Sequence, residues 1–214
     1  MKKIIVVLFA LIMISSFSAC GSDSSSGGGE KKYKSSEFID LMESRHYYMD
    51  ATIIALGIKM PTKMAVDGED VDYTVDAMGY ETRTLILGDK AYLISDKNKE
   101  YQVIDAGGSD AESAKSAVAD YSDYGDIEFT EKGKEAIPDY DADTAEYEFE
   151  KFSAGGDDGI VMTYYYKDDS LYCIYAAVGD LKTYMIINEL SSKIPDGMLS
   201  LPDGYSKVET INVL

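Results

Sequence analysis

Several residue types that build catalytic and metal sites are scarce in this chain. Its 214 residues include no tryptophan, one histidine and two cysteines. Zinc sites rely on His and Cys side chains, and this chain offers too few of them. A Ser-His-Asp triad would have to use His46, and no GxSxG sequence accompanies it. We therefore expect no enzyme and no cofactor, and we interpret His46 as a histidine at a helix-to-strand junction.

Basic residues are also few. Lys and Arg number 20 against 39 Asp and Glu, which gives a formal net charge of -19 at pH 7. Nucleic-acid binding depends on Lys and Arg that neutralise phosphates, so a nucleic-acid partner is excluded. The acidity favours solubility, and it makes an anionic lipid surface repel the body of the protein.

The N-terminal sequence MKKIIVVLFALIMISSFSAC has the features of an export signal. Two lysines precede an apolar run, residues 4–14, that is too short for a membrane span of about 20 residues. Small residues then precede Cys20, as in a bacterial lipobox, although Phe17 stands where leucine is usual. We expect residues 1–19 to be a lipoprotein signal peptide and Cys20 to carry a diacylglyceryl group. An ordinary secretory signal is the alternative.

Residues 20–34 form the expected lipid-anchored tether, because GSDSSSGGG is a flexible sequence that buries no apolar surface. Two acyl chains would hold the protein stably at a bilayer. The expected location is the extracytoplasmic face of a bacterial membrane, most simply the cell membrane. With Cys20 acylated, Cys173 has no internal disulfide partner, and its place in LYCIY indicates a small buried side chain.

Residues 35–214 are expected to form one domain. A capping serine, Ser35, opens a helix predicted to end near Ser44, and a second helix is predicted over residues 110–121. The Gly88-Asp89 pair predicts a two-residue hairpin of type II′. The fold class is α+β: a large curved antiparallel sheet, an open half-barrel of about ten strands, with helices covering the concave face. Strands are predicted at 47–56, 60–66, 71–78, 82–87, 91–95, 126–130, 146–152, 160–166, 171–178 and 183–190, with a last one within 207–214.

The segment GIVMTYYYKDDSLYCIY is apolar or aromatic on both faces of its two predicted strands. Alternation places Met162 and Tyr164 on one face, and it assigns Met185 to an outer face and Tyr184 to an inner one. Flexible methionines suit an adaptable apolar surface, but an ordinary core that uses Met and Tyr stays an equal alternative. The residues expected to line an apolar concavity are Met49, Met64, Leu85, Tyr92, Met162, Tyr164, Tyr172, Ile174, Tyr184 and Ile186.

The acidic stretch DYDADTAEYEFE contains one candidate metal site. Asp139, Asp141, Asp143 and Glu150 occupy positions 1, 3, 5 and 12 of an EF-hand-like loop. Position 6 is Thr144, where the turn of such a loop needs glycine, and the flanking sequences indicate strands. Two interpretations stay open: a weak calcium site and, more simply, an acidic loop that enters a strand.

The order of these features resembles the LolA/LolB-like superfamily, which includes LppX/LprG-type lipoproteins and RseB-type sensor domains. The resemblance rests on the lipobox, the tether, the N-terminal helix, hairpins such as ETRTLILGDKAYLISDKNKEY, and the end IPDGMLSLPDGYSKV. It implies a half-barrel around an apolar cavity and a carrier or sensor of a lipid or another amphiphile. The alternative is a fully packed interaction or regulatory module that binds a protein or a cell-envelope polymer.

Overall fold

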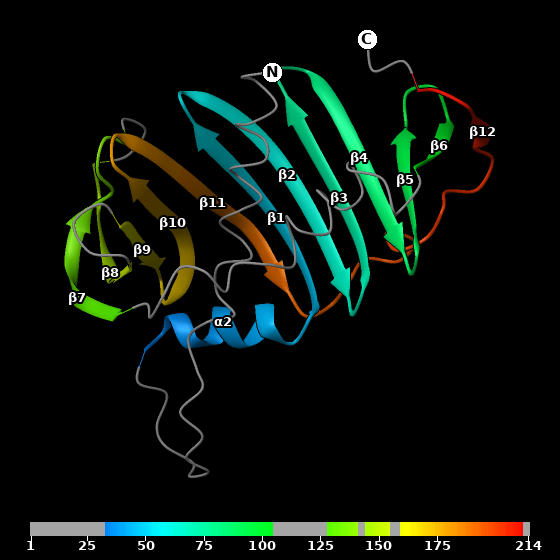
Figure 1. Cartoon of the computed structure of the whole chain (residues 1–214). Coiled ribbons are helices and arrows are strands. Elements are labelled where there is room, and N and C mark those ends of the chain that lie inside the picture. Colours follow the sequence, from blue (N-terminus) through cyan, green and yellow to red (C-terminus); the bar gives the residue numbers. More distant parts are fainter. Residues whose placement is uncertain (1–32, 105–127, 141–143, 155–158, 212–214) are drawn as a thin grey trace.

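A single sheet dominates the computed structural model, which describes residues 33–104, 128–140, 144–154 and 159–211 (Figure 1). Within these ranges one nine-residue helix, α2 (Ser35–Glu43), precedes a sheet of 12 strands. The strands are β1 (His46–Ala55), β2 (Ile58–Asp67), β3 (Asp70–Ala77), β4 (Tyr80–Leu87), β5 (Lys90–Ser95), β6 (Glu100–Ile104), β7 (Glu128–Ala136), β8 (Glu146–Ala154), β9 (Ile160–Lys167), β10 (Ser170–Val178), β11 (Leu181–Ser191) and β12 (Ser206–Val208).

Two meanders meet in the middle of this sheet. The strand order is β12-β6-β5-β4-β3-β2-β1-β11-β10-β9-β8-β7, so β1 pairs with β11 at the centre. Tight turns keep consecutive strands adjacent; for example, the Gly88-Asp89 turn joins β4 to β5, and Gly88 has the positive φ of 56° that a type II′ turn requires. All pairs are antiparallel except β12 with β6, which is parallel. The sheet ends in two edges and is not closed into a barrel.

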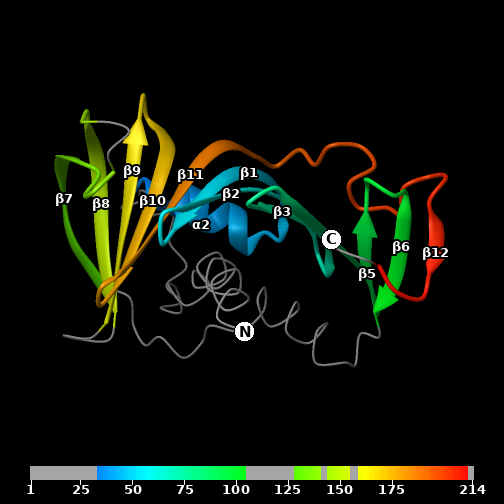
Figure 2. The same ribbon diagram turned by 90° about the horizontal axis from the view of Figure 1, so that it is seen from above.

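The sheet curves around α2, so the helix lies on the concave side (Figure 2). The largest apolar cluster combines this helix with one face of the sheet, through Phe38 and Met42 of α2 and alternate residues of β1 such as Met49 and Ile53. Apolar side chains at two-residue spacing on neighbouring strands pack on one face of a sheet, which explains this arrangement.

Two smaller clusters occupy the opposite, convex face. Tyr165, Cys173 and Tyr184 belong to one, which is covered by Ile137 after β7. Leu85 belongs to the other, at the β4–β6 end of the sheet, together with Tyr92 and Ile94; Leu201 and Tyr205 of the C-terminal segment pack against it.

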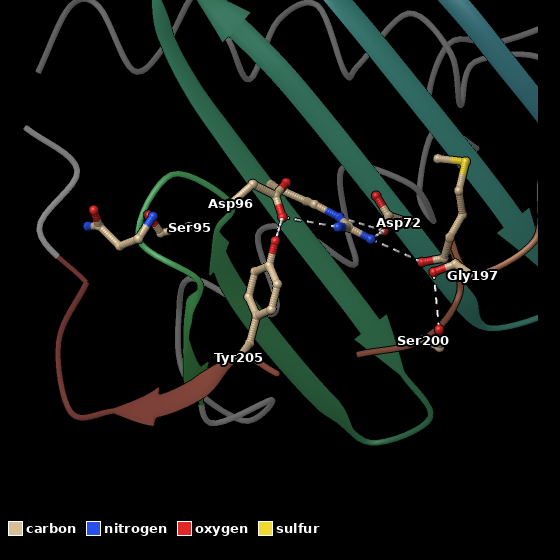
Figure 3. A network of polar contacts seen from close by, with 9 residues as sticks. Asp72, Ser95, Asp96, Gly197, Ser200 and Tyr205 are labelled. Carbon is tan, nitrogen blue, oxygen red and sulfur yellow. Dashed lines mark hydrogen bonds and ion pairs between the residues drawn. The ribbon is translucent and has the colours of Figure 1, made fainter. Parts of the chain in front are cut away.

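A polar network fastens the C-terminal segment to this convex face (Figure 3). Arg83 donates to the carboxylate of Asp72 at 2.6 and 2.9 Å and lies 3.4 Å from Asp96. The hydroxyl of Tyr205 donates to Asp96 at 2.7 Å, and Arg83 also donates to the carbonyl of Met198 at 3.4 Å. Burial raises the pKa of Asp72 even though Arg83 stabilises its charged form. Arg83 thus links β3, the turn after β5 and the chain that leads to β12.

The expected α+β fold with a large curved antiparallel sheet is confirmed, with specific differences. β6 was not predicted, because EYQVI is short and directly follows a charged turn. The last strand covers only Ser206–Val208. The predicted helix 110–121, the signal peptide 1–19 and the lipidation site Cys20 lie outside the described residues.

Candidate functional site: the concave face

The concave face is broad, apolar and rich in methionine. Its cluster draws on nine strands, from β8 to β5, and on α2. Flexible thioether side chains let such a surface adapt its shape. The methionines in the cluster are Met42, Met49, Met60, Met64, Met162 and Met185.

Five of the ten predicted lining residues belong to this face. Met49, Met64, Met162, Tyr164 and Ile174 are all members of the concave cluster. The other five lie on the convex face: Tyr172, Tyr184 and Ile186 in the cluster under Ile137, and Leu85 and Tyr92 under the C-terminal segment.

One β-bulge explains part of this division. The register between β9 and β10 shifts between Leu171 and Cys173, so Tyr172 is the extra residue and shares the convex face with Cys173. On β11 the assignment of faces was inverted: Met185, predicted to point outward, is in the concave cluster. A second register shift, between Asp50 and Ala51 of β1, makes Asn188 the extra residue of β11, and Leu190 beyond it also packs against the concave cluster. Alternation alone cannot show where a bulge reverses it.

Polar contacts fix the N-terminus of α2 to the sheet. The carboxylate of Glu150, on β8, accepts hydrogen bonds from the backbone N–H of Lys34 at 2.8 Å and of Ser35 at 2.9 Å. The hydroxyl of Tyr166 donates to the same carboxylate at 3.4 Å. Glu150 therefore caps the helix, and Ser35, the predicted cap, makes no such bond. A negative charge at this end also suits the helix dipole.

The Lys34 ammonium adds a second set of contacts at the same end. It donates to Asp169 at 2.7 Å and to Glu148 at 2.6 Å, which together raise the pKa of Lys34. Asp169 lies in the β9–β10 turn and Glu148 on β8, so the start of α2 is tied to two neighbouring parts of the sheet. The position of the helix over the concave face is thus set from its N-terminus.

An open hollow of about 890 Å³ lies between α2, the β9–β10 turn and β11. Phe38 and Leu41 of the helix and Leu171, Ile187 and Leu190 of the sheet form its apolar lining. These side chains belong to the concave cluster or pack against it, so the hollow opens at the edge of the apolar face. Charged residues of the helix start and of the turn border it: Lys34, Glu37, Lys167, Asp168, Asp169 and Glu189.

Three tyrosine hydroxyls of the concave cluster have different surroundings. Tyr47 donates to the sulfur of Met64 at 3.4 Å, and Tyr164 to that of Met162 at 3.5 Å. The hydroxyl of Tyr73 is buried and has no partner at full hydrogen-bond geometry, and the nearby Thr62 hydroxyl offsets a small part of the effect of burial on its pKa. Burial raises the pKa of Tyr47 to about 12 and also raises the pKa of Tyr73. Tyr73 is therefore a neutral donor in apolar surroundings.

The candidate metal ligands have other roles where they are described. Glu150 caps α2, and Asp139 pairs with the Lys182 ammonium. Asp141 and Asp143 lie outside the described residues. No group of three or more His, Cys, Asp or Glu in the described part of the chain is arranged to hold a metal ion.

The single histidine and the described cysteine are placed as structural residues. His46 Nδ1 lies 3.0 Å from Asp67 on the surface, at the start of β1. Cys173 is fully buried, and burial raises the pKa of its thiol to about 12, which suppresses the reactive thiolate. Within the described ranges no helix is long and apolar enough to cross a membrane.

Comparison with known proteins finds similarity at the level of structure. No family model and no curated protein sequence matches the chain. Among solved structures, LprF from Mycobacterium bovis has 7% identity and a TM-score of 0.38, over 78% of this chain and 96% of that one. MucB has 8% identity and a TM-score of 0.42, over 83% of this chain and 66% of that one. A LolA superfamily protein from Nitrosomonas europaea has 9% identity and a TM-score of 0.31, over 75% of this chain and 96% of that one. The superfamily named from the sequence is thus among the similar structures; at these TM-scores we base no functional argument on the likeness.

Proposed function

We propose that this protein binds a lipid or another amphiphile against its concave face, as a membrane-anchored extracytoplasmic carrier or sensor. The observation that carries the proposal is the width of the apolar face relative to its helix. Nine strands at a spacing of about 4.8 Å extend over roughly 38 Å. A helix of nine residues is only about 13 Å long. The apolar face is therefore much wider than the described helix that packs on it.

The chemistry of this face suits an alkyl chain that carries a polar group. Each methylene that leaves water for an apolar surface contributes about 0.8 kcal/mol. Met60 and Met64, on β2, can adapt to chains of different shape. The hydroxyl of Tyr73, on the neighbouring strand β3, is a donor without a partner, and an ester or headgroup oxygen would accept its hydrogen bond.

Lipid attachment at Cys20 and the extracytoplasmic location are parts of this proposal that rest on the sequence. The tether would keep the domain near the bilayer from which an amphiphile is taken or on which it is sensed. No bond chemistry is assigned to the protein; binding and release are its proposed activity.

A second candidate is a packed module that binds a protein or cell-envelope polymer, with its own side chains filling the concavity. The near-complete burial of Met49 and Met64, at 0% and 1% exposure, favours it. A filled face would leave no space for an alkyl chain.

Native mass spectrometry of residues 21–214, produced without the export signal, separates the two candidates. We expect a bound amphiphile in near-stoichiometric amount that is lost on denaturation. Tyr73→Phe should weaken its binding by about threefold to tenfold, because only the hydrogen bond is removed. Tyr92→Phe, on the convex face, is the matched control. An apo mass that does not change when fatty acids and phospholipids are added would refute binding and favour the packed module.

A further inference from the structure

Three of the four large apolar side chains that are exposed in the described residues lie at one end of the sheet. In the described part of the chain four such residues are exposed: Leu56 at 65%, Met78 at 58%, Tyr80 at 56% and Phe129 at 36%. The first three lie in or beside the β1–β2 and β3–β4 turns. Because β2 pairs with β3, these two turns are neighbours at the same end of the sheet. Figure 1 shows that this end is opposite to α2.

Leu56 and Met78 have backbone conformations that such residues rarely adopt. Their φ angles are 53° and 60°, and the glycines that follow them have φ of 76° and 84°. Each turn is therefore a type I′ turn, in which the first position favours Asn, Asp or Gly. A branched or long side chain in this left-handed region costs roughly 1–2 kcal/mol per residue.

The other two-residue turns of the sheet have the usual residues. The remaining type I′ turn is Asp168-Asp169, and the type II′ turns begin with glycine, as Gly68-Glu69, Gly88-Asp89 and Gly179-Asp180. At these four turns the sequence agrees with the backbone. Among the two-residue turns that the structure describes, apolar side chains occupy left-handed positions only at these two neighbouring tips, and strain of this kind marks candidate functional positions.

We propose that these tips, Leu56, Met78 and Tyr80, insert into the interface of a lipid bilayer. Three partly exposed side chains on two turns fall well short of the ~800 Å² that each partner of a stable protein interface buries. Isolated apolar side chains at loop tips, with an aromatic residue beside them, suit the boundary between headgroups and acyl chains. Lys59, exposed beside the first turn, would reach the headgroups.

The chain allows this contact even if it is anchored at Cys20. Between Cys20 and Tyr33 a stretched chain spans up to about 45 Å. A ten-residue strand such as β1 extends over only about 33 Å. The tips can therefore contact the anchoring bilayer when the domain tilts onto the membrane surface. This inference does not depend on the amphiphile proposed for the concave face.

Photo-crosslinking on the full chain in bacterial membranes tests the proposal. Tyr80 is replaced by the aromatic photo-crosslinker p-benzoyl-phenylalanine, and the mass of each adduct is measured after irradiation. We expect lipid adducts. The same probe with Leu56→Asn and Met78→Asn should give about tenfold less lipid adduct, because the apolar side chains that insert are gone.

Two controls separate this result from a folding defect. Asn-Gly is the preferred type I′ pair, so the double variant should melt at the same or a higher temperature. Leu56→Met keeps an apolar tip and should keep the lipid adduct. Adducts to another protein, to a second copy of the chain or to nothing would overturn the proposal, as would equal lipid adduct in the double variant.

Discussion

Removal of the Glu150 carboxylate tests how α2 is held. This side chain is 6% exposed and accepts two backbone hydrogen bonds at 2.8 and 2.9 Å. Hydrogen bonds to a charged group contribute about 1.5–3 kcal/mol each, and part of this is regained if water reaches the freed N–H groups. We expect Glu150→Ala to lower the free energy of unfolding by about 2–4 kcal/mol. Glu150→Gln keeps one acceptor oxygen and should cost about half as much.

Urea unfolding followed by far-ultraviolet circular dichroism and tyrosine fluorescence measures this change. Glu148→Gln is the matched control, because its side chain lies two residues away on β8 and is 48% exposed in its ion pair with Lys34. Exposed ion pairs contribute about 0–1 kcal/mol, so the control should differ little from the native protein. If Glu150→Ala were as stable as Glu148→Gln, the assignment of Glu150 as the helix cap would be wrong.

Two further changes test the burial of Tyr47 and the attachment of the C-terminal segment through Tyr205. Burial raises the pKa of Tyr47 from 10.0 to about 12, so its contribution to stability is complete below pH 10 and is lost as pH rises towards 12. In Tyr47→Phe the free energy of unfolding should therefore fall less steeply over this pH range. An unchanged slope would contradict the pKa shift. Tyr205→Phe removes the hydrogen bond to Asp96 and should lower the free energy of unfolding by about 1 kcal/mol. Amide hydrogen exchange should become faster only at Ser206–Val208 and its neighbours. Equally faster exchange over the whole sheet would show that Tyr205 does not hold the C-terminal segment locally.

Sequence patterns predicted most elements of this fold because particular residue types occur at the turns, the helix and the strands. Gly88-Asp89 predicts its turn through the backbone freedom of glycine, and the apolar spacing of Phe38 and Met42 predicts the helix. The concave residues of β1, β2 and β9 follow from plain alternation. Where strand pairing has no register shift, the two-residue alternation of side chains correctly predicts which face of the sheet each residue occupies.

The features that sequence reasoning missed depend on contacts between distant residues. Glu150 resembles a calcium ligand in sequence, and only the fold brings it to the start of α2, 115 residues away. Tyr172 lies on the opposite face from the predicted one because of a β-bulge, and no residue type in the sequence predicts that bulge. The exposure of Leu56 and Met78 could have been predicted locally, because each is an apolar residue directly before glycine at a hairpin turn.

The contacts that hold α2 and the residues proposed to bind an amphiphile are separate parts of the concave side. Glu150 lies on β8 and Tyr73 on β3, and six strand spacings of about 4.8 Å separate them by roughly 29 Å measured along the curved sheet. Sites this far apart with no shared partner contribute independently to stability. The carboxylate on β8 therefore holds the start of the helix, whereas the proposed contacts to an amphiphile are made by side chains of β2 and β3. On the proposed function, Tyr73→Phe should weaken binding and leave the cap intact, whereas Glu150→Ala should lower stability without removing a ligand contact.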